Sequence, residues 1–330
     1  ARNLAGVPFP VAADNSQLTT VCEAVKSAAE KLQCPGKKPL LFEPKTMDPI
    51  DRQVLLERRL ASNDFIQREA GTLLLVSRDE SSSIMVNEED HLRIQVLGNG
   101  LDFSSVWDVA DCLDSHIESK LNYAFDSKLG FLTACPTNLG TGLRASVMMH
   151  LPGLVMSKNM DKVINAVNHL GIAVRGLFGE GSDASGSIFQ ISNQQTLGES
   201  ETAILERLET TLDNIVYQER MAREKLMEDD GMRLTDKISR AVGALKTCFL
   251  IQSSEAMDHL SLIRLAADFG YLPEKFRALA DRMFIEVQPG HVQLSAGQPI
   301  EPGERDRLRA ETLRKEFLRM PQLNLDAQVD

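Results

Sequence analysis

The 330-residue sequence lacks several features that define common classes of protein. No apolar run approaches the ~20 residues that span a bilayer, and the N-terminus lacks the charged and then apolar layout of a signal peptide. The five cysteines form no CxxC pair and show no metal-type spacing to the histidines. These absences predict a soluble, cytoplasmic protein whose cysteines are reduced thiols.

Positive charge is also scarce. Lys and Arg total 36 against 47 Asp and Glu, which gives a net charge of -11. Binding to nucleic-acid phosphates needs a basic face, so this balance argues against nucleic acid as the main partner and favours a cationic substrate. With 43% hydrophobic residues, the chain is able to bury one large core or two modest ones and should be globular.

An initiator methionine is missing as well, because the chain opens with Ala1-Arg2-Asn3. We therefore expect a fragment or a processed form. The sequence shows no internal repeat and no low-complexity tract.

The hydrophobic pattern predicts an α+β fold, a largely antiparallel sheet flanked by helices and followed by a helical C-terminal extension. Three short β-rich runs between residues 72 and 97 should form adjacent antiparallel strands. Further strands are expected at 145–151, 172–174 and 188–191. Helical periodicity covers residues 16–33, 106–121, 161–170, 199–229, 233–250, 254–269 and 304–320. The glycine-rich segment 176–186 should be a mobile loop.

An acidic cluster, NEEDHLR at residues 87–93, lies between two of the strand-like runs. Side-chain alternation sends Glu88 and Asp90 to one side and Glu89 to the other. A triplet of carboxylates in a β-connection is most often a solvated turn, and the alternative is a site for proton transfer.

Two glycine-containing segments carry arginines. The first, CPTNLGTGLRAS at residues 135–146, leads Arg144 into a predicted strand, and the second, VRGLFGEG at 174–181, places Arg175 at a strand end. Backbone amides beside a guanidinium are able to cradle phosphate oxygens. The first segment is not a P-loop, because no GK[ST] follows its glycines. Taken singly, each segment is usually a plain turn or flexible loop.

Together these segments resemble the signature of the guanidino-kinase (ATP:guanido phosphotransferase) family, in the family's order and with ISNxxxLG at residues 191–198. Within it, MMHLP at 148–152, GEGS at 179–182 and RDRLRA at 305–310 resemble the bacterial protein-arginine kinase branch. The resemblance implies a catalytic core at 1–230, lacking the N-terminal part of the family domain. It also implies a helical region at 231–330, packed on the same domain.

The resemblance also implies site residues. Glu89 and Glu180 should grip the substrate guanidinium, with Glu89 as general base, Asp90 in the same network and Cys135 as a reactive thiol beside it. Nucleotide contacts are implied for Arg2, Arg59, Arg93, Arg144, Ala145, Ser146, Val147, Met148, Arg175, Gly176, Leu177, Phe178, Gly179 and Glu180. A second, allosteric pocket for phosphoarginine is implied at Arg305, Asp306, Arg307, Leu308, Arg309 and Ala310; a charged helix end is the plainer interpretation.

The implied reaction moves the γ-phosphoryl of ATP to arginine side chains of proteins and marks them for ATP-dependent proteolysis. Mg²⁺ should be held mainly through the nucleotide, with no dedicated metal cage. Implied partners are arginine-bearing protein substrates, an activator or adaptor, an ATP-dependent protease and a second copy in a homodimer. Two alternatives stay open: a kinase for free arginine or a related guanidino metabolite, and an inactive phosphoarginine-binding module, because two phosphate-binding arginines that the family carries before Ala1 are missing from this sequence.

Overall fold

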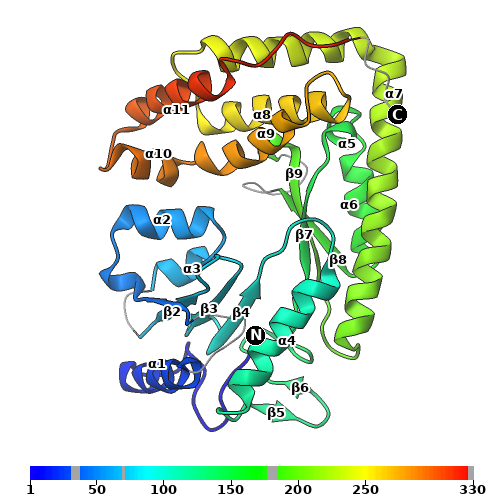
Figure 1. Cartoon of the computed structure of the whole chain (residues 1–330). Helices are drawn as coiled ribbons and strands as arrows, with labels where there is room; N and C mark the ends of the chain where they lie inside the picture. The colour runs from blue at the N-terminus through cyan, green and yellow to red at the C-terminus, as the bar shows by residue number, and fades with distance from the viewer. Residues whose placement is uncertain (31–37, 69–70, 177–183, 326–330) are drawn as a thin grey trace. The chain divides into compact units, whose positions relative to one another are not determined.

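The computed structural model describes residues 1–30, 38–68, 71–176 and 184–325. The chain folds into two compact units. The first comprises Ala1–Ala145 and Gln194–Arg207, and the second comprises Ser146–Asn193 and Leu208–Asp330. Both combine antiparallel strands with helices, and the second carries the helical C-terminal region, so the predicted α+β fold is confirmed (Figure 1).

The first unit is built on a four-stranded antiparallel sheet in the order β1-β2-β3-β4. Its strands are β1 (Leu40–Phe42), β2 (Leu73–Val76), β3 (Ser82–Val86) and β4 (Leu92–Val96). The three runs predicted as adjacent strands are β2, β3 and β4. The other elements are α1 (Asn15–Ala29), η1 (Pro44–Thr46), α2 (Pro49–Glu57), α3 (Asn63–Ile66), α4 (Phe103–Glu118), β5 (Phe125–Asp126), β6 (Gly130–Phe131) and η2 (Pro136–Asn138).

Side-chain alternation gives this sheet two buried faces. One face packs Leu73, Leu75 and Val86 against Val21 of α1 and Ile117 of α4. The opposite face packs other strand residues against helix α3 and the turn before it; its members are Leu60, Ala61, Phe65, Leu74, Val76 and Met85. Because both faces are covered, β2 is apolar throughout and β3 is apolar from Ile84 to Val86.

Helix α1 begins with a reciprocal cap at Asp14. The Asp14 carboxylate accepts a hydrogen bond from the Gln17 backbone N–H at 2.9 Å, and the Gln17 side chain accepts one from the Asp14 N–H at 2.9 Å. This reciprocal capping satisfies two backbone donors that a helix start would otherwise leave unpaired.

The second unit contains a three-stranded antiparallel sheet in the order β7-β9-β8. Its strands are β7 (Ser146–His150), β8 (Ile172–Gly176) and β9 (Ile188–Asn193). Helix α6 packs against β8, and Ile172, Val174, Phe189 and Ile191 are buried. The helices and turns are α5 (Pro152–Met156), α6 (Met160–Asn168), η3 (Ser185–Ser187), α8 (Ser253–Asp268), α9 (Lys275–Glu286), α10 (Pro289–Ala296) and α11 (Pro302–Phe317).

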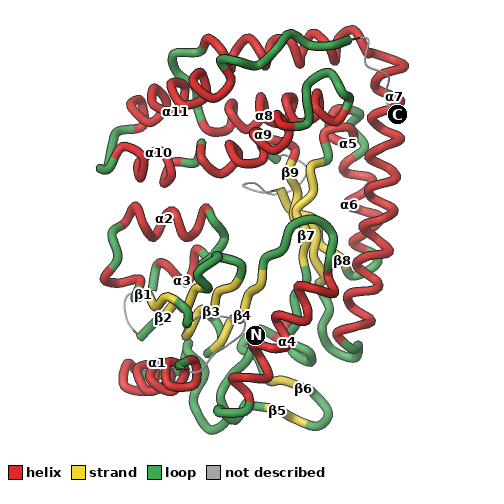
Figure 2. Tube along the Cα trace, in the orientation of Figure 1, coloured by secondary structure: helices red, strands yellow, loops and turns green. Residues whose placement is uncertain are grey.

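Helix α7 (Glu201–Thr247) begins in the first unit and continues into the second. Separate helices were predicted at 199–229 and 233–250, and the structure agrees, because non-helical backbone at Asp230 (φ -147°, ψ 27°) divides α7 into two helical parts. The last turns of α7 pack with α8, α9 and α11 around Leu260, Met283 and Phe317. Figure 2 shows this C-terminal region as helices joined by short loops.

The cysteines correct one expectation. Cys22, Cys135 and Cys248 are free thiols, but Cys112 of α4 is disulfide-bonded, so the prediction that every cysteine is reduced is wrong at Cys112. Spacing along the chain does not reveal which cysteines approach within bonding distance in the fold.

Within the described ranges, each helix is either too short or too polar to cross a bilayer.

Candidate active site

The acidic cluster forms the tight connection between β3 and β4. The Asn87 N–H donates to the His91 carbonyl at 2.9 Å, which closes the loop. Asn87 has left-handed backbone (φ +61°), and its buried side-chain amide donates to the carbonyls of Leu18 at 2.9 Å and Gly71 at 2.7 Å. Asparagine tolerates this conformation better than most residues. Asn87 therefore fixes the start of the acidic loop to α1 and to the turn before β2.

The Glu88 side chain is buried and forms an ion pair with Arg93. Its carboxylate accepts hydrogen bonds from the Arg93 guanidinium at 2.7 Å, from the Ser62 hydroxyl and from the Glu89 N–H at 3.2 Å. Burial alone would raise the pKa of Glu88, but the Arg93 charge and these donors outweigh it and lower the pKa below its ordinary value. Glu88 is therefore an ionised acid that holds the loop in shape.

Glu89 is the exposed acid of the cluster. Partial desolvation of its carboxylate, and then the negative charges of Asp90 and Glu88, raise the pKa of Glu89, with Arg93 acting in the opposite direction. A carboxylate with a raised pKa is a better proton acceptor than an ordinary glutamate. Exposure and raised basicity together make Glu89 the member of the triplet suited to meet a substrate.

Asp90 is buried and joins two loops. Its Oδ1 accepts hydrogen bonds from the Asn3 side-chain amide and from the Ala134 N–H, both at 2.6 Å. Asn3 in turn accepts the His91 N–H at 2.9 Å. Asp90 thus fixes the residue before Cys135 against the acidic loop, which is a positioning role. Its predicted catalytic contact stays a prediction.

Cys135 lies directly after this attachment point. Its half-buried thiol is 2.9 Å from the Thr137 hydroxyl, and its carbonyl accepts a hydrogen bond from the Thr133 hydroxyl at 2.8 Å. Asp90 therefore links Cys135 through the backbone to the loop that carries Glu89.

The glycines of the following turn are required by close backbone packing. Gly140 has φ +107°, and a Cβ there would lie 2.4 Å from the Thr196 carbonyl oxygen. The Thr196 hydroxyl also donates to the carbonyls of Thr137 at 2.9 Å and Leu139 at 2.7 Å. The ISNxxxLG segment therefore braces the turn that leads to Arg144, whose side chain is exposed.

Two other arginines of the first unit have different surroundings. Arg2 is buried: its guanidinium donates to Asp114 at 2.6 Å and to the Thr141 carbonyl at 2.8 Å, and it lies 3.6 Å from the centre of the Phe131 ring. Arg59 has left-handed backbone (φ +61°), and burial lowers the pKa of its guanidinium. These contacts give Arg2 a structural role in holding the turn at Thr141. Nucleotide contacts of both residues stay predictions.

In the second unit, several predicted nucleotide residues share one face of the three-stranded sheet. Met148 of β7 and Arg175 of β8 both lie opposite Gln190 of the central strand β9. Ser146, two residues before Met148, is on the same face, and its hydroxyl accepts a hydrogen bond from the Gln190 amide at 3.1 Å. Val147 belongs to the opposite, apolar face, and Gly176 ends β8.

Gln190 is not among the residues predicted from the sequence to bind nucleotide. Alternation in 188–191 marks it as an outward position between Phe189 and Ile191, but only the strand order β7-β9-β8 places it between Met148 and Arg175. We call Ser146, Met148, Arg175 and Gln190 the polar sheet face.

The predicted site residues thus divide between the two units. Glu89, Asp90, Arg93, Cys135 and Arg144 belong to the first unit, together with Arg2, Arg59 and Ala145, and the polar sheet face belongs to the second. Glu180, with Leu177, Phe178 and Gly179, lies outside the described residues, as does most of the predicted loop 176–186.

The RDRLRA segment lies in α11. Arg309 is buried, with a side chain 2% exposed, and donates to the carbonyls of Val287 at 2.7 Å and Ile251 at 2.8 Å and to Asp306. Arg307 is exposed and pairs with Glu304 and Glu311. Arg309 therefore attaches α11 to the C-terminal end of α9 at Val287 and to the loop before α8 at Ile251. Its neighbour Ala310 belongs to the hydrophobic core.

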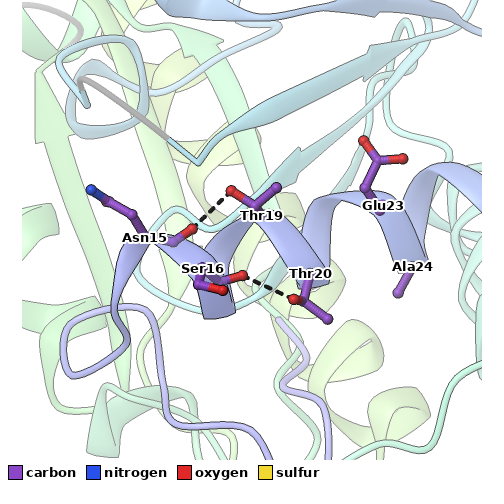
Figure 3. Close-up of a pocket in the computed structure, with 6 residues that line it drawn as sticks. All are labelled: Asn15, Ser16, Thr19, Thr20, Glu23 and Ala24. Atoms are coloured by element: carbon purple, nitrogen blue, oxygen red, sulfur yellow. Dashed lines mark hydrogen bonds between the residues drawn. The ribbon is translucent and has the colours of Figure 1, made fainter.

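A hollow on the surface of α1 is separate from these residues. It is lined by one face of the helix, namely Asn15, Ser16, Thr19, Thr20, Glu23 and Ala24 (Figure 3). The Thr19 and Thr20 hydroxyls donate to the carbonyls one turn earlier, at 2.8 and 2.9 Å. Because these polar groups are already engaged within the helix, the hollow is not assigned to the site.

Comparison with known proteins identifies the family. A family model described as ATP:guanido phosphotransferase, C-terminal catalytic domain, matches residues 20–222. The chain belongs to the ATP:guanido phosphotransferase family. A second model, described as the Protein-arginine kinase McsB C-terminal domain, matches residues 231–328 of this guanido phosphotransferase. The recognised family resemblance is thereby confirmed, and the chain is an ATP-dependent phosphotransferase.

Curated relatives cover nearly the whole guanido phosphotransferase chain. The chain is 41% identical over 316 residues to a protein named Protein-arginine kinase from Brevibacillus brevis. The aligned region covers 96% of this chain and 88% of the relative. A relative with the same name from a Geobacillus species is 43% identical over 316 residues, covering 96% of this chain and 87% of the relative.

Solved structures support the fold. The duplicated taurocyamine kinase from Schistosoma mansoni superposes with a TM-score of 0.59 at 23% identity, covering 77% of this chain and 37% of that one. Lombricine kinase gives a TM-score of 0.55 at 23% identity, covering 66% of this chain and 64% of that one. At this identity the comparison speaks for a guanidino-kinase fold alone.

Proposed function

We propose that this guanido phosphotransferase transfers the γ-phosphoryl of ATP to arginine side chains of proteins. The proposal rests on Glu89, an exposed carboxylate whose pKa is raised. Its neighbour Glu88 is held in an ion pair with Arg93. A cationic, delocalised guanidinium is a poor nucleophile until a carboxylate orients it and accepts a proton. Two curated relatives named Protein-arginine kinase and the match of residues 231–328 support proteins as the acceptor.

In the proposed reaction, a nitrogen of the substrate guanidinium attacks the γ-phosphorus. The bond from that phosphorus to the β,γ-bridging oxygen breaks, ADP leaves with the electron pair, and the guanidinium proton passes to the Glu89 carboxylate. Glu180 is proposed as the second acid that aligns the guanidinium, and Cys135 as a thiol beside it. Alignment of nucleophile and phosphorus is the larger part of catalysis in such a transfer.

Phosphate binding is proposed for the arginines. Arg93, Arg144 and Arg175 would neutralise the triphosphate, with Ser146 and Gln190 donating hydrogen bonds from the polar sheet face. Among the described residues, no cluster of three or more His, Cys, Asp or Glu is arranged to hold a metal ion. Mg²⁺ is proposed to be held mainly through phosphate oxygens and water, where it would supply charge neutralisation.

A regulatory role is proposed for the RDRLRA segment of α11. Arg309 is committed to backbone carbonyls of the core, so a phosphoarginine would be met by the more accessible Arg305 and Arg307, with Asp306 facing its guanidinium. Leu308 would be an apolar neighbour of the pocket, whereas Ala310 is fully buried in the core and would support the pocket from beneath. This assignment rests on the motif and on the accessibility of Arg305 and Arg307.

The cellular setting follows from the proposed reaction. Phosphorylated arginines would mark proteins for an ATP-dependent protease, with an adaptor and a homodimer through the C-terminal helices as further partners. ATP as the phosphoryl donor favours the cytoplasm. The division into a catalytic core at 1–230 and a helical region at 231–330 is also proposed, and the two family models, at 20–222 and 231–328, support it.

Incubation with ATP and either casein or free arginine tests the proposal. Phosphoarginine on casein is the expected product. Phosphorylation of the free amino acid alone would instead favour a metabolite kinase, and binding of phosphoarginine without ATP turnover would favour an inactive binding module. The matched variant Arg307→Lys, in the exposed part of α11, should leave basal transfer unchanged while it weakens any response to added phosphoarginine.

A further inference from the structure

One end of the β7–β9 pair is held by side chains from helices outside the sheet. β7 ends at His150 and β9 begins at Ile188, and the Leu151 N–H donates to the Ser187 carbonyl at 2.9 Å just beyond the pair. Glu219 of α7 and both Asp258 and Ser261 of α8 contact this end. We call these three side chains the strand clamp.

Glu219 holds the residues that follow β7. Its buried carboxylate accepts hydrogen bonds from the N–H groups of Gly153 at 2.8 Å and Leu154 at 2.9 Å, in the first turn of α5. Arg223 donates to the same carboxylate at 2.6 Å and to Asp268 of α8 at 2.8 Å. A buried carboxylate with two backbone donors and an arginine is a strong and directional attachment.

Approach of α7 to this turn is close enough to require glycine. A Cβ on Gly153 would lie 2.9 Å from Arg223 Cγ and 3.0 Å from a Glu219 carboxylate oxygen. The start of α5 is therefore packed directly on α7, and movement of α7 would move the end of β7 with it.

Asp258 and Ser261 hold the same end from α8, and they lie one turn apart on that helix. Asp258 Oδ1 accepts the Gly186 N–H at 2.8 Å, two residues before β9, where Gly186 has φ +69°. The Ser261 hydroxyl is 2.7 Å from Nε2 of His150, the last residue of β7. Both strands of the pair are thus attached to α8.

We infer that Asp258, Ser261 and Glu219 are positioning residues that set the placement of the polar sheet face and thereby the affinity for ATP. The clamp touches the pair at His150, four residues and about 13 Å along β7 from Ser146, so it does not contact nucleotide itself. A hydrogen-bonded strand pair transmits a shift at one end to the other, because its register is fixed. The inference rests on the proposed function, which makes this face the nucleotide-binding one. It also assigns to α8, within the matched residues 231–328, control of nucleotide affinity.

Binding of a fluorescent ADP analogue with Mg²⁺ to the full chain tests the clamp. Asp258 lies at the surface, so Asp258→Ala should leave the fold intact while it weakens ADP binding by about three- to tenfold, the usual worth of one hydrogen bond. Asp258→Asn keeps the acceptor Oδ1 and should bind within about twofold of the unmodified chain. Glu255→Ala removes another exposed acid of α8 and should bind normally.

Glu219→Gln supplies a second arm, because it removes one of two acceptor oxygens and the charge that faces Arg223. It should weaken ADP binding at least as much as Asp258→Ala, and Glu224→Gln, an exposed acid of the same helix, is its control. In transfer assays the KM for ATP should rise more than kcat falls.

Two results would overturn the clamp while leaving the proposed function intact: normal ADP binding by both Asp258→Ala and Glu219→Gln, or a loss in Asp258→Asn equal to that in Asp258→Ala. Failure of the unmodified chain to bind ADP would overturn the proposed function and the clamp together.

Discussion

The Arg93 guanidinium donates to the Glu88 carboxylate at 2.7 Å, while the neighbouring Glu89 side chain stays exposed. Arg93 thereby pairs with Glu88, one of three adjacent acids, and leaves the next acid, Glu89, accessible from solvent. Arg93 is 43% exposed on its side chain, so it is also accessible to a phosphate. This arrangement separates an acid that holds the loop, Glu88, from the acid that we propose meets the substrate, Glu89.

Glu88→Gln should destabilise the fold in a pH-dependent way. The folded-state pKa of Glu88 is lower than its ordinary value of 4.5, so its ionised form stabilises the native state above that pH, and the contribution is lost as the pH falls toward the folded-state pKa. We expect a loss of about 1 kcal/mol at neutral pH, since partial exposure of Arg93 screens the pair.

Urea unfolding at neutral pH and at two values below 4.5 measures this difference. The gap between the unmodified chain and Glu88→Gln should shrink as the pH falls. Glu80→Gln, which breaks the more exposed Arg58–Glu80 pair, should cost less. A gap that widens at low pH would contradict the assignment of Glu88.

The pH dependence of transfer should report on Glu89. Because its pKa is raised and the base must be ionised, the rate should rise with pH through a value above the ordinary glutamate range. Asp90→Asn keeps the Oδ1 acceptor for Asn3 and Ala134 but removes a negative charge, so the acid limb of kcat/KM should move to lower pH.

Burial is the largest cause of the Glu89 shift, so the limb in Asp90→Asn should still lie above the ordinary value. The charge of Asp64 also raises the pKa of Glu89, but by less than that of Asp90, so Asp64→Asn should move the limb less. An acid limb that moves upward in Asp90→Asn would rule out Glu89 as the titrating base.

Two glycine-to-alanine substitutions should change the free energy of unfolding in opposite directions. Gly153→Ala would force a Cβ to within 2.9 Å of Arg223 and should destabilise the protein by about 1–3 kcal/mol. Gly243 lies inside α7 with nothing within 4 Å of its Cβ position, so Gly243→Ala should stabilise the helix by about 0.5–1 kcal/mol. Thermal unfolding compares them directly, and a stabilised Gly153→Ala would disprove the tight contact.

Within RDRLRA, the two charge-conserving substitutions should differ. Arg309→Lys leaves a single ammonium to replace a fork that serves Val287, Ile251 and Asp306, and we expect a loss of about 2–3 kcal/mol. Arg307→Lys, in an exposed pair, should stay within about 0.5 kcal/mol. Urea unfolding measures both, and equal losses would contradict a structural role specific to Arg309.

Much of the fold is predictable from local pattern. Strand β2 is an apolar run and β4 alternates apolar and polar residues, both bounded by polar turns, and their neighbours in the sequence are their neighbours in the sheet. The edge strand Leu40–Phe42 was missed because three residues carry too little periodicity. Helix α10 begins with Pro289-Gly290, which resembles a turn, although proline is favoured in the first turn of a helix.

The acidic triplet shows how far side-chain alternation reaches. It predicted Glu88 and Asp90 on one side and Glu89 on the other, and the burial of the first two agrees. It could not predict which partners bury them, because Ser62, Asn3 and Ala134 come from distant parts of the chain. Gln190 escaped notice for the same reason: its meaning depends on a strand order that the sequence does not state.

Transfer of labelled γ-phosphate from ATP to casein, compared between the unmodified chain and Glu89→Gln, shows whether Glu89 is the base in phosphorylation of protein arginines. The unmodified chain should label arginine residues, and Glu89→Gln should transfer about 100-fold more slowly while it binds the fluorescent ADP analogue normally. Glu23→Gln, an exposed acid of α1, is the matched control and should transfer at the normal rate. Equal rates for Glu89→Gln and the unmodified chain would contradict the role of Glu89 as the base. Label on residues other than arginine would contradict arginine as the acceptor.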